Sequence, residues 1–248
     1  MQTPELTPLG DGAIRVSFGT EISPEINDRV RGLAALLEEE NCPWAEEWVP
    51  SYTVLTVFYH SDHISYADAA EALRRRAERA ASTSAPPARL FELPTYYGGA
   101  EGPDLEDVAE HASLSIKEVI ERHAAPSYRV YMLGFTPGFP YLGGMDAKLA
   151  TPRLTNPRAH VPAGSVGIAG GQTGVYSLDS PGGWQLIGRT PVRLYDPARE
   201  PVTLFRAGDL VSFVPVSREE YERVEAAVAA GTYEISWKEW GGASSEDG

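Results

Sequence analysis

Glycine is concentrated in one stretch of this chain, and that concentration limits its fold more than any other feature. Residues 131–189 hold twelve of the 24 glycines, together with six prolines. At this density the backbone must make many tight turns, positive-φ positions and close approaches. Short runs of β-forming residues, such as 175–176 and 184–187, lie between the turns. The stretch therefore predicts a small closed β-structure with elaborate loops, not a helical domain.

The same region is locally cationic within an acidic protein. The whole chain has 21 lysine and arginine residues against 35 acidic residues, a net charge of −14. Residues 127–216, in contrast, hold eight cations and five anions. This pattern is typical of a pocket for a small carboxylate or phosphate, although arginines that only decorate the rim of a barrel fit it equally well. The acidic balance of the whole chain argues against nucleic-acid binding, which needs a basic face.

The order of the predicted elements indicates two domains. Strands are predicted at 13–18, 48–49, 52–59 and 90–93, and helices at 24–40 and 66–81. The resulting order βαββαβ predicts a small ferredoxin-like α+β domain over residues 1–85. The polar stretch 82–87 has no large apolar residue to bury and marks the boundary. The second domain, residues 86–248, is predicted to be a mainly-β barrel with leading helices and a C-terminal helix.

Capping patterns place the helices of the second domain. Asp104 is predicted to cap a short helix, and Ser115 with Glu118 forms a capping box for a helix over 116–123. Ser217 with Glu220 predicts a second capping box at the start of the C-terminal helix. Two strands, 202–205 and 210–215, are predicted to end the β region.

Several common catalytic motifs are absent from the sequence. None of the three lysines ends a glycine-rich phosphate loop, and neither a strand–GxGxxG–helix unit nor a GxSxG elbow occurs. His60 and His63 have no third ligand near them in sequence, so a polar turn is favoured over a metal site. Catalytic residues therefore stay unassigned, and no metal is expected. The residues alone predict a two-domain protein with a β-barrel pocket for a small anion.

The sequence also predicts a cytoplasmic location. No apolar run reaches the roughly 18–20 residues of a membrane span, so no membrane association is expected. The first residues, MQTPELTPLGDG, lack the cationic start and apolar stretch of a signal peptide. The single cysteine, Cys42, cannot form an internal disulfide and fits a reducing compartment.

Three long motifs closely resemble the allophanate hydrolase subunit 1 family. They are GFTPGFPYLGG at 134–144, PRLTNPRAHVPAGSVGIAGGQTGVY at 152–176 and SPGGWQLIGRTP at 180–191. The similarity extends over about residues 7–218. This family includes the B component of the bacterial ATP-dependent 5-oxoprolinase and the inhibitor of a sporulation histidine kinase. The resemblance implies a small α/β N-terminal domain followed by a cyclophilin-like β-barrel.

The resemblance also implies a function that is shared between chains. The expected activity is that of the B component of a 5-oxoprolinase, a hydrolase complex that opens 5-oxo-L-proline to L-glutamate. Its expected partners are a subunit 2 homologue, which is the C component, and a lactam-utilisation homologue, which is the A component. The complex would use ATP, whereas this chain alone would bind no cofactor and would be inactive. Two alternatives stay open: a carboxyltransferase component acting on urea or a related amide, and a non-catalytic inhibitor of a histidine kinase.

Positions within the three motifs are candidates for binding a lactam or small anion. Arginines can pair with a carboxylate, a glycine turn can offer backbone N–H groups, and hydroxyl or amide side chains can bind a lactam. Aromatic side chains can form the wall of a pocket or an interface with a partner. The substrate-binding candidates are Arg153, Arg158, Ser165, Gly170, Gly171, Gln172, Tyr176 and Arg189. The wall or interface candidates are Phe135, Pro137, Phe139, Tyr141 and Trp184.

Overall fold

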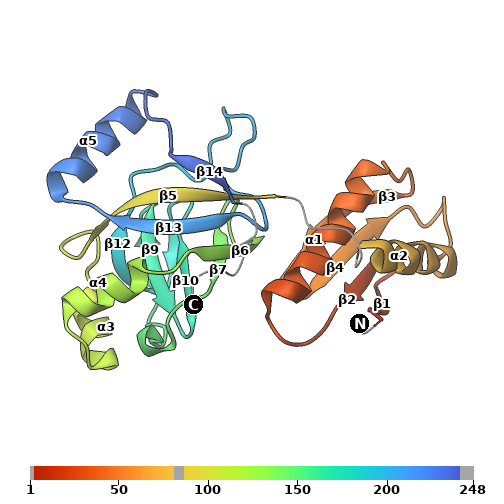
Figure 1. Cartoon of the computed structure of the whole chain (residues 1–248), viewed down its shortest axis with the longest axis horizontal. Helices are drawn as coiled ribbons and strands as arrows, with labels where there is room; N and C mark the ends of the chain where they lie inside the picture. Colours follow the sequence, from red (N-terminus) through yellow and green to blue (C-terminus); the bar gives the residue numbers. More distant parts are fainter. Residues whose placement is uncertain (1–2, 81–86, 241–248) are drawn as a thin grey trace, which may run out of the picture. The chain divides into compact units, whose positions relative to one another are not determined.

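A computed structural model describes residues 3–80 and 87–240 of the chain (Figure 1). The chain divides into two compact units, Met1–Pro87 and Ala88–Gly248. Most of the polar stretch predicted as a boundary, residues 82–86, lies outside the described residues. No helix in the described ranges is both long and apolar enough to cross a membrane.

The first unit is a four-stranded antiparallel sheet that packs against two helices. The sheet has the order β1-β2-β4-β3, and its core residues include Ile14, Val16, Leu55 and Val57. The first helix starts as predicted, because the Ser23 side chain accepts a hydrogen bond from the backbone of the first helical turn. The elements are β1 (Glu5–Leu9), β2 (Ala13–Ser17), α1 (Pro24–Glu39), β3 (Ala45–Pro50), β4 (Val54–Tyr59) and α2 (Tyr66–Ala80).

The ferredoxin-like arrangement predicted for this unit is not confirmed. The sheet includes a strand that the sequence did not predict, β1. It pairs with β2 in a register that sets Leu6 opposite Val16. The segment predicted as the last strand of this domain, 90–93, belongs instead to a longer strand of the second unit. Pro8 and the exposure of β1 hid this strand from the sequence analysis, since proline is tolerated only at sheet edges and the hydrophobic alternation is weak there.

The second unit is a mixed β-barrel. Strands β12-β9-β10-β7-β6-β13-β5 follow one another in the sheet, and β12 also pairs with β5, which closes the barrel. The pairing of β13 with β5 is parallel, and β14 extends the sheet from β5. The strands are β5 (Ala88–Tyr97), β6 (Tyr128–Leu133), β7 (Pro140–Gly143), β8 (Arg158–Val161), β9 (Ser165–Ala169), β10 (Gln172–Val175), β11 (Ser180–Gly182), β12 (Gln185–Arg189), β13 (Leu210–Pro215) and β14 (Trp237–Trp240).

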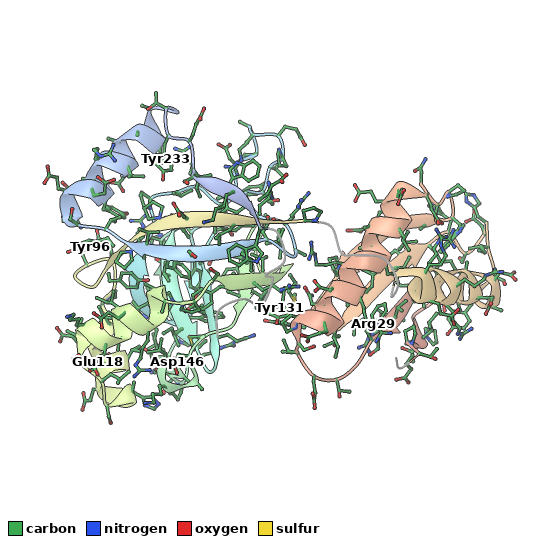
Figure 2. All side chains as sticks on the ribbon, viewed as in Figure 1. Arg29, Tyr96, Glu118, Tyr131, Asp146 and Tyr233 are labelled. Atoms are coloured by element: carbon green, nitrogen blue, oxygen red, sulfur yellow. The ribbon has the colours of Figure 1, made fainter. Side chains whose placement is uncertain are left out.

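The helices of this unit lie outside the barrel strands (Figure 1). They are α3 (Leu105–Ala112), α4 (Ile116–Ala124), the single turn η1 (Ala147–Leu149) and α5 (Arg218–Ala229). The capping box of α4 is confirmed, because Ser115 and Glu118 exchange side-chain and backbone hydrogen bonds. Figure 2 labels Glu118 on this helix and Asp146 just before η1. Arg122 of α4 donates a 2.7 Å hydrogen bond to Asp146 and so joins the two segments.

Three local predictions need correction. Asp104 precedes α3 but makes no side-chain cap; its carboxylate turns into the protein instead. Ser217 accepts a hydrogen bond from the Glu220 backbone, but the Glu220 carboxylate binds Arg223, so the second capping box is only half formed. Residues 202–205 form no strand, and that segment contributes only an isolated bridge between Tyr195 and Thr203. Buried Phe205 explains the apolar pattern there without a strand.

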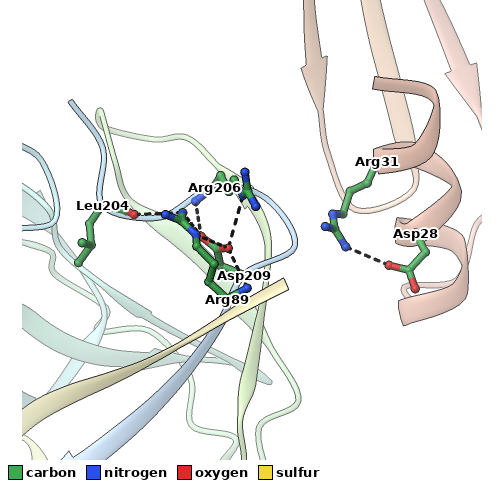
Figure 3. Close-up of polar contacts among 6 residues, drawn as sticks. All are labelled: Asp28, Arg31, Arg89, Leu204, Arg206 and Asp209. Atoms are coloured by element: carbon green, nitrogen blue, oxygen red, sulfur yellow. Dashed lines mark hydrogen bonds and ion pairs between the residues drawn. The ribbon is translucent and has the colours of Figure 1, made fainter. Parts of the chain in front are cut away.

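A buried carboxylate joins the start of β5 to the turn before β13 (Figure 3). Asp209 is almost fully buried and accepts hydrogen bonds from the Arg89 side chain at 2.6 and 3.1 Å. It also accepts a 2.9 Å bond from the backbone of Arg206. Figure 3 also draws a separate pair in the first unit, Asp28 and Arg31 on α1, at 3.2 Å. The bonds from Arg89 tie the start of β5 to the turn before β13 and so support the parallel pairing of these two strands.

A fully buried histidine, His123, lies in the last turn of α4. Its Nδ1 and Nε2 atoms lie 2.8 Å from the Tyr97 hydroxyl and the Thr173 hydroxyl, respectively. Thr173 donates its hydroxyl proton to the Gly167 carbonyl, so Nε2 must carry the imidazole proton and Nδ1 must accept from Tyr97. Burial lowers the pKa of His123 from 6.5 to about 3. The ring is therefore neutral in the folded protein at neutral pH.

We predict that His123 makes the protein sensitive to mild acid. The unfolded chain takes up a proton below pH 6.5 while the folded chain does not, so stability is complete above that pH and is lost as the pH falls toward 3. The free energy of unfolding should fall by up to about 1.4 kcal/mol per pH unit in this window. Urea unfolding between pH 7 and pH 5 measures this slope. The variant His123→Gln cannot titrate and should show a flatter profile; an unchanged slope would contradict this assignment.

Candidate functional site

An aromatic cavity of about 330 Å³ lies on the second unit. It takes its walls from the loop before β7, from β7 itself and from the segments around β8, β10 and β11. Its lining residues are Phe135, Phe139, Tyr141, Arg153, Leu154, Pro157, Tyr176, Pro181, Gly182, Gly183 and Trp184. We call this space the aromatic cavity. Its volume is suited to a small ligand.

The aromatic cavity lies against the outer face of the barrel strands. Side chains alternate along β10, where Thr173 and Val175 point to the barrel core and Gly174 faces the aromatic rings. A Cβ atom at Gly174 would lie 3.0 Å from the Phe139 ring and 3.1 Å from the Trp184 ring. Glycine is therefore needed here for the rings to approach the strand. The barrel core is made largely of apolar side chains, and the aromatic cavity lies on its outer side.

Phe139 is the centre of the aromatic wall. Its ring makes edge-to-face contacts with Tyr141, Tyr176 and Trp184 at centroid distances of 5.1, 5.5 and 5.6 Å. Such pairs add to stability beyond the area that they bury. Phe139 and Trp184 are largely buried, so both belong to the wall and not to an exposed surface.

Phe135 differs from the other aromatic candidates because it is 62% exposed. Its backbone has a φ of +62°, which is unfavourable for a residue with a side chain. A tight turn imposes this angle, since the Thr136 N–H donates to the Gly134 carbonyl at 2.7 Å. Strained backbone of this kind is often found at functional sites. The turn holds the exposed ring at the mouth of the cavity, 5.5 Å from the Phe139 ring.

Arg153 and Tyr176 provide polar groups at the aromatic cavity. The guanidinium carbon of Arg153 lies 6.0 Å from the centroid of the Trp184 ring, a cation–π arrangement. Burial raises the pKa of Tyr176, although a hydrogen bond from the Trp184 backbone and the charges of Arg153 and Arg158 act in the opposite direction. The Tyr176 hydroxyl therefore stays protonated at neutral pH and can donate a hydrogen bond, but it cannot act as a base.

Arg158 does not line the aromatic cavity. Its Nη2 atom donates a 2.5 Å hydrogen bond to the carboxylate of Asp104, which is almost fully buried. The other Asp104 oxygen accepts from the Leu186 backbone at 2.6 Å. Arg158 thus neutralises a buried charge that anchors β12 to the start of α3. Sequence alone assigns Asp104 the role of a helix cap, because it lies just before a helix, and gives no sign of its distant partners.

The remaining sequence candidates lie elsewhere in the second unit. Ser165 is buried at the start of β9, and its backbone pairs with Tyr176 and Pro162. Gly170 and Gly171 form the exposed turn between β9 and β10, and Gln172 follows them at the start of β10. Arg189, Pro137 and these four residues are absent from the described lining of the aromatic cavity. Of the eight substrate-binding candidates, the structure brings only Arg153 and Tyr176 to this cavity.

The aromatic cavity can bind and orient a ligand, but it has no evident catalytic pair. Among the described residues, its lining contains no Ser, Cys, His, Asp or Glu side chain, so no nucleophile and base lie within hydrogen-bond reach of each other. Across residues 3–80 and 87–240, no group of three or more His, Cys, Asp and Glu side chains could hold a metal ion. The geometry offers one cation, hydroxyl donors and aromatic walls.

Residues 4–205 match the family model described as "Carboxyltransferase domain, subdomain C and D". The chain belongs to this carboxyltransferase-domain family. A curated relative from Bacillus subtilis (strain 168), named as the B subunit of 5-oxoprolinase, is 46% identical over 227 residues, covering 88% of this chain and 95% of the relative. A protein of the same name from Escherichia coli O157:H7 is 44% identical over 215 residues, covering 87% and 97%.

A solved structure of similar fold belongs to a much larger protein. The crystal structure of Kluyveromyces lactis urea carboxylase matches 96% of this chain with a TM-score of 0.78, at 20% sequence identity. The present chain covers 24% of that protein. At this identity the match supports the fold alone. The matched part of this chain includes the mainly-β barrel.

We predict that Arg158 stabilises the carboxyltransferase-domain fold through Asp104. Replacing Arg158 with Ala leaves a buried carboxylate unpaired, which should lower the free energy of unfolding by about 3 kcal/mol. Urea denaturation followed by tryptophan fluorescence measures the loss. In an Asp104→Asn background the same substitution should cost much less. An equal cost in both backgrounds would show that the ion pair does not carry the effect.

Proposed function

We propose that the chain is the B component of an ATP-dependent 5-oxoprolinase, which converts 5-oxo-L-proline to L-glutamate together with homologues of the C and A components. The observation that carries this proposal is the identity of 44–46% to two proteins named as the B subunit of 5-oxoprolinase, over 95–97% of their length. Similarity over almost the entire relative favours the same role more strongly than a match to a single motif.

The aromatic cavity supports a ligand of this class. A cyclic lactam acid has one carboxylate, which Arg153 can pair, and one amide, which can accept a hydrogen bond from the protonated Tyr176 hydroxyl. The flat rings of Phe139 and Trp184 provide a wall for a small ring. These groups bind and orient the ligand, but they supply neither a nucleophile nor a base.

The missing catalytic groups then come from another chain. An enzyme must place a nucleophile or base within hydrogen-bond reach of its substrate, and the described lining of the aromatic cavity has none. If the cavity is a half-site that the C or the A component completes, the partner supplies the missing nucleophile or base. Phe135 is suited to the contact, because exposed aromatic residues are favoured at the centres of interfaces. The chain would accordingly be inactive alone, and ATP would be used by the assembled complex in the cytoplasm.

A second candidate is a carboxyltransferase component that acts on urea or a related amide. The match of residues 4–205 to a family described as a carboxyltransferase domain favours it, and a biotin carrier would then have to come from elsewhere. A neutral amide such as urea has no carboxylate for Arg153 to pair. The charge requirement of the substrate therefore separates the two candidates.

We predict that Arg153→Gln lowers kcat/KM at least tenfold for 5-oxoproline-dependent ATP hydrolysis by the reconstituted complex. The variant removes the charge that pairs with the substrate carboxylate, worth about 1.5–3 kcal/mol. The matched control is Arg75→Gln, which changes an exposed arginine on α2 whose ion pair with Glu71 is long, at 3.9 Å. Unchanged activity of the Arg153 variant, or full turnover by the purified chain alone, would argue against the proposed half-site.

We predict that Phe135→Asn weakens assembly with the C-component homologue at least tenfold. Asparagine tolerates the positive φ of this turn better than other residues, so the variant removes the ring while sparing the backbone. The control Tyr66→Asn removes another exposed aromatic ring, at the start of α2. Size-exclusion chromatography and calorimetry measure the affinity. Equal affinities for the wild type and the Phe135 variant would rule out a central contact by this ring.

A further inference from the structure

A second cavity, of about 260 Å³, lies between α5 and the residues at the end of β12. Within the described part of the chain, it shares no lining residue with the aromatic cavity. Two arginines line it, Arg189 and Arg193, and Glu225 is the one acidic side chain in this described lining. We call it the arginine cavity. Its other walls are Ala163, Gly164, Ser177, Thr190, Pro191, Val192, Tyr221, Val228 and Ala229.

The orientation of Arg189 is fixed while part of its guanidinium stays available. Its Nε–H donates a 2.8 Å hydrogen bond to the Ala163 carbonyl. Ala163 is itself held, because its N–H donates a 2.8 Å bond to the Asp179 carboxylate. Among the residues that the structure describes, none accepts a hydrogen bond from the two Nη atoms of Arg189. A guanidinium held in this way loses little conformational freedom when it binds an anion.

Arg193 adds a second positive charge, and acidic side chains of the described residues engage it only weakly. Its side chain is exposed, and its nearest acidic group in the described residues is Asp196, at 4.0 Å. That distance is too long for a strong hydrogen bond, so the guanidinium can turn toward a ligand. Glu225, on α5, makes no ion pair with either arginine within the described residues; it accepts a long hydrogen bond of 3.4 Å from Tyr221. The described lining of the arginine cavity therefore has two cations against one exposed anion.

We propose that the arginine cavity is a binding site for a small oxyanion, distinct from the aromatic cavity. Two arginines line this one cavity, and guanidinium groups match the charge and the planar geometry of carboxylate or phosphate oxygens. The cavity is slightly smaller than the roughly 300–1,000 Å³ typical of drug-sized ligands, which favours a small anion. The ligand class is therefore free phosphate or a short carboxylic acid. This inference does not depend on the proposed enzyme activity.

Calorimetric titration of the full chain tests the site, with inorganic phosphate in one arm and succinate in the other. We expect saturable binding of at least one probe, and the arm that saturates identifies the type of anion. Arg189→Gln and Arg193→Gln should each weaken binding at least tenfold, because each removes a charged donor. Arg193→Gln removes no hydrogen bond that its side chain donates in the described residues, so it separates loss of binding from loss of folding. Glu225→Gln should strengthen binding, since it removes a repulsive charge.

A matched control makes the result specific to this cavity. Arg75→Gln changes an exposed arginine on α2, outside this cavity, and should leave the affinity for either anion unchanged. The proposal is overturned if neither probe saturates up to about 10 mM, which corresponds to only about 3 kcal/mol of binding free energy. It is also overturned if Arg193→Gln binds as the wild type does, if Glu225→Gln weakens binding, or if Arg75→Gln abolishes it. Since binding is measured on the chain alone, failure here leaves the proposed complex untouched.

Discussion

Closure of the barrel between β5 and β12 is the constraint on which the rest of the second unit depends. The two strands pair through only Tyr96, Tyr97, Gly188 and Arg189, so the ladder at this position is short. Its backbones lie so close that a Cβ atom at Gly188 would be 2.6 Å from the Tyr96 carbonyl. Asp104 reinforces the closure from the side, because its backbone and carboxylate both bind Leu186 of β12. Arg158 then neutralises that carboxylate. Both cavities are built on segments that this closure holds in place.

The aromatic cavity combines a rigid wall with one strained position at its mouth. Phe139, Tyr176 and Trp184 contact one another edge to face and are largely buried, so their rings have little freedom. Phe135 has the opposite properties, with an exposed ring on a backbone of positive φ. Folding alone gains little from an exposed ring in such a conformation, since glycine would fit the turn with less strain. The exposed ring and the unfavourable backbone angle together favour a role for Phe135 in contact with a ligand or another chain, beyond stabilising the fold.

The sequence predicted those features that depend on local chemistry. The start of the first helix at residue 24, the cap at Ser115, the strand at 13–18 and the β character of the glycine-rich stretch all follow from neighbouring residues, and the structure contains them. The features that it did not predict depend on distant partners. Asp104 and Arg158 lie 54 positions apart, and only their pairing makes Asp104 a buried anchor instead of a helix cap. Similarly, the segment 90–93 has the pattern of a strand, but nothing local tells which of the two sheets it joins.

The cationic character of the glycine-rich region, which suggested one anion pocket, is divided among separate roles. Arg153 faces the aromatic cavity, Arg158 neutralises Asp104, and Arg189 with Arg193 lines the arginine cavity. The two cavities are nevertheless adjacent along the chain, because Tyr176 lines one and Ser177 lines the other. The Ser177 hydroxyl also bonds at 3.0 Å to Thr136, which follows the strained Phe135. An anion held in the arginine cavity would therefore restrain the same backbone segment that positions the Tyr176 hydroxyl and the Phe135 turn.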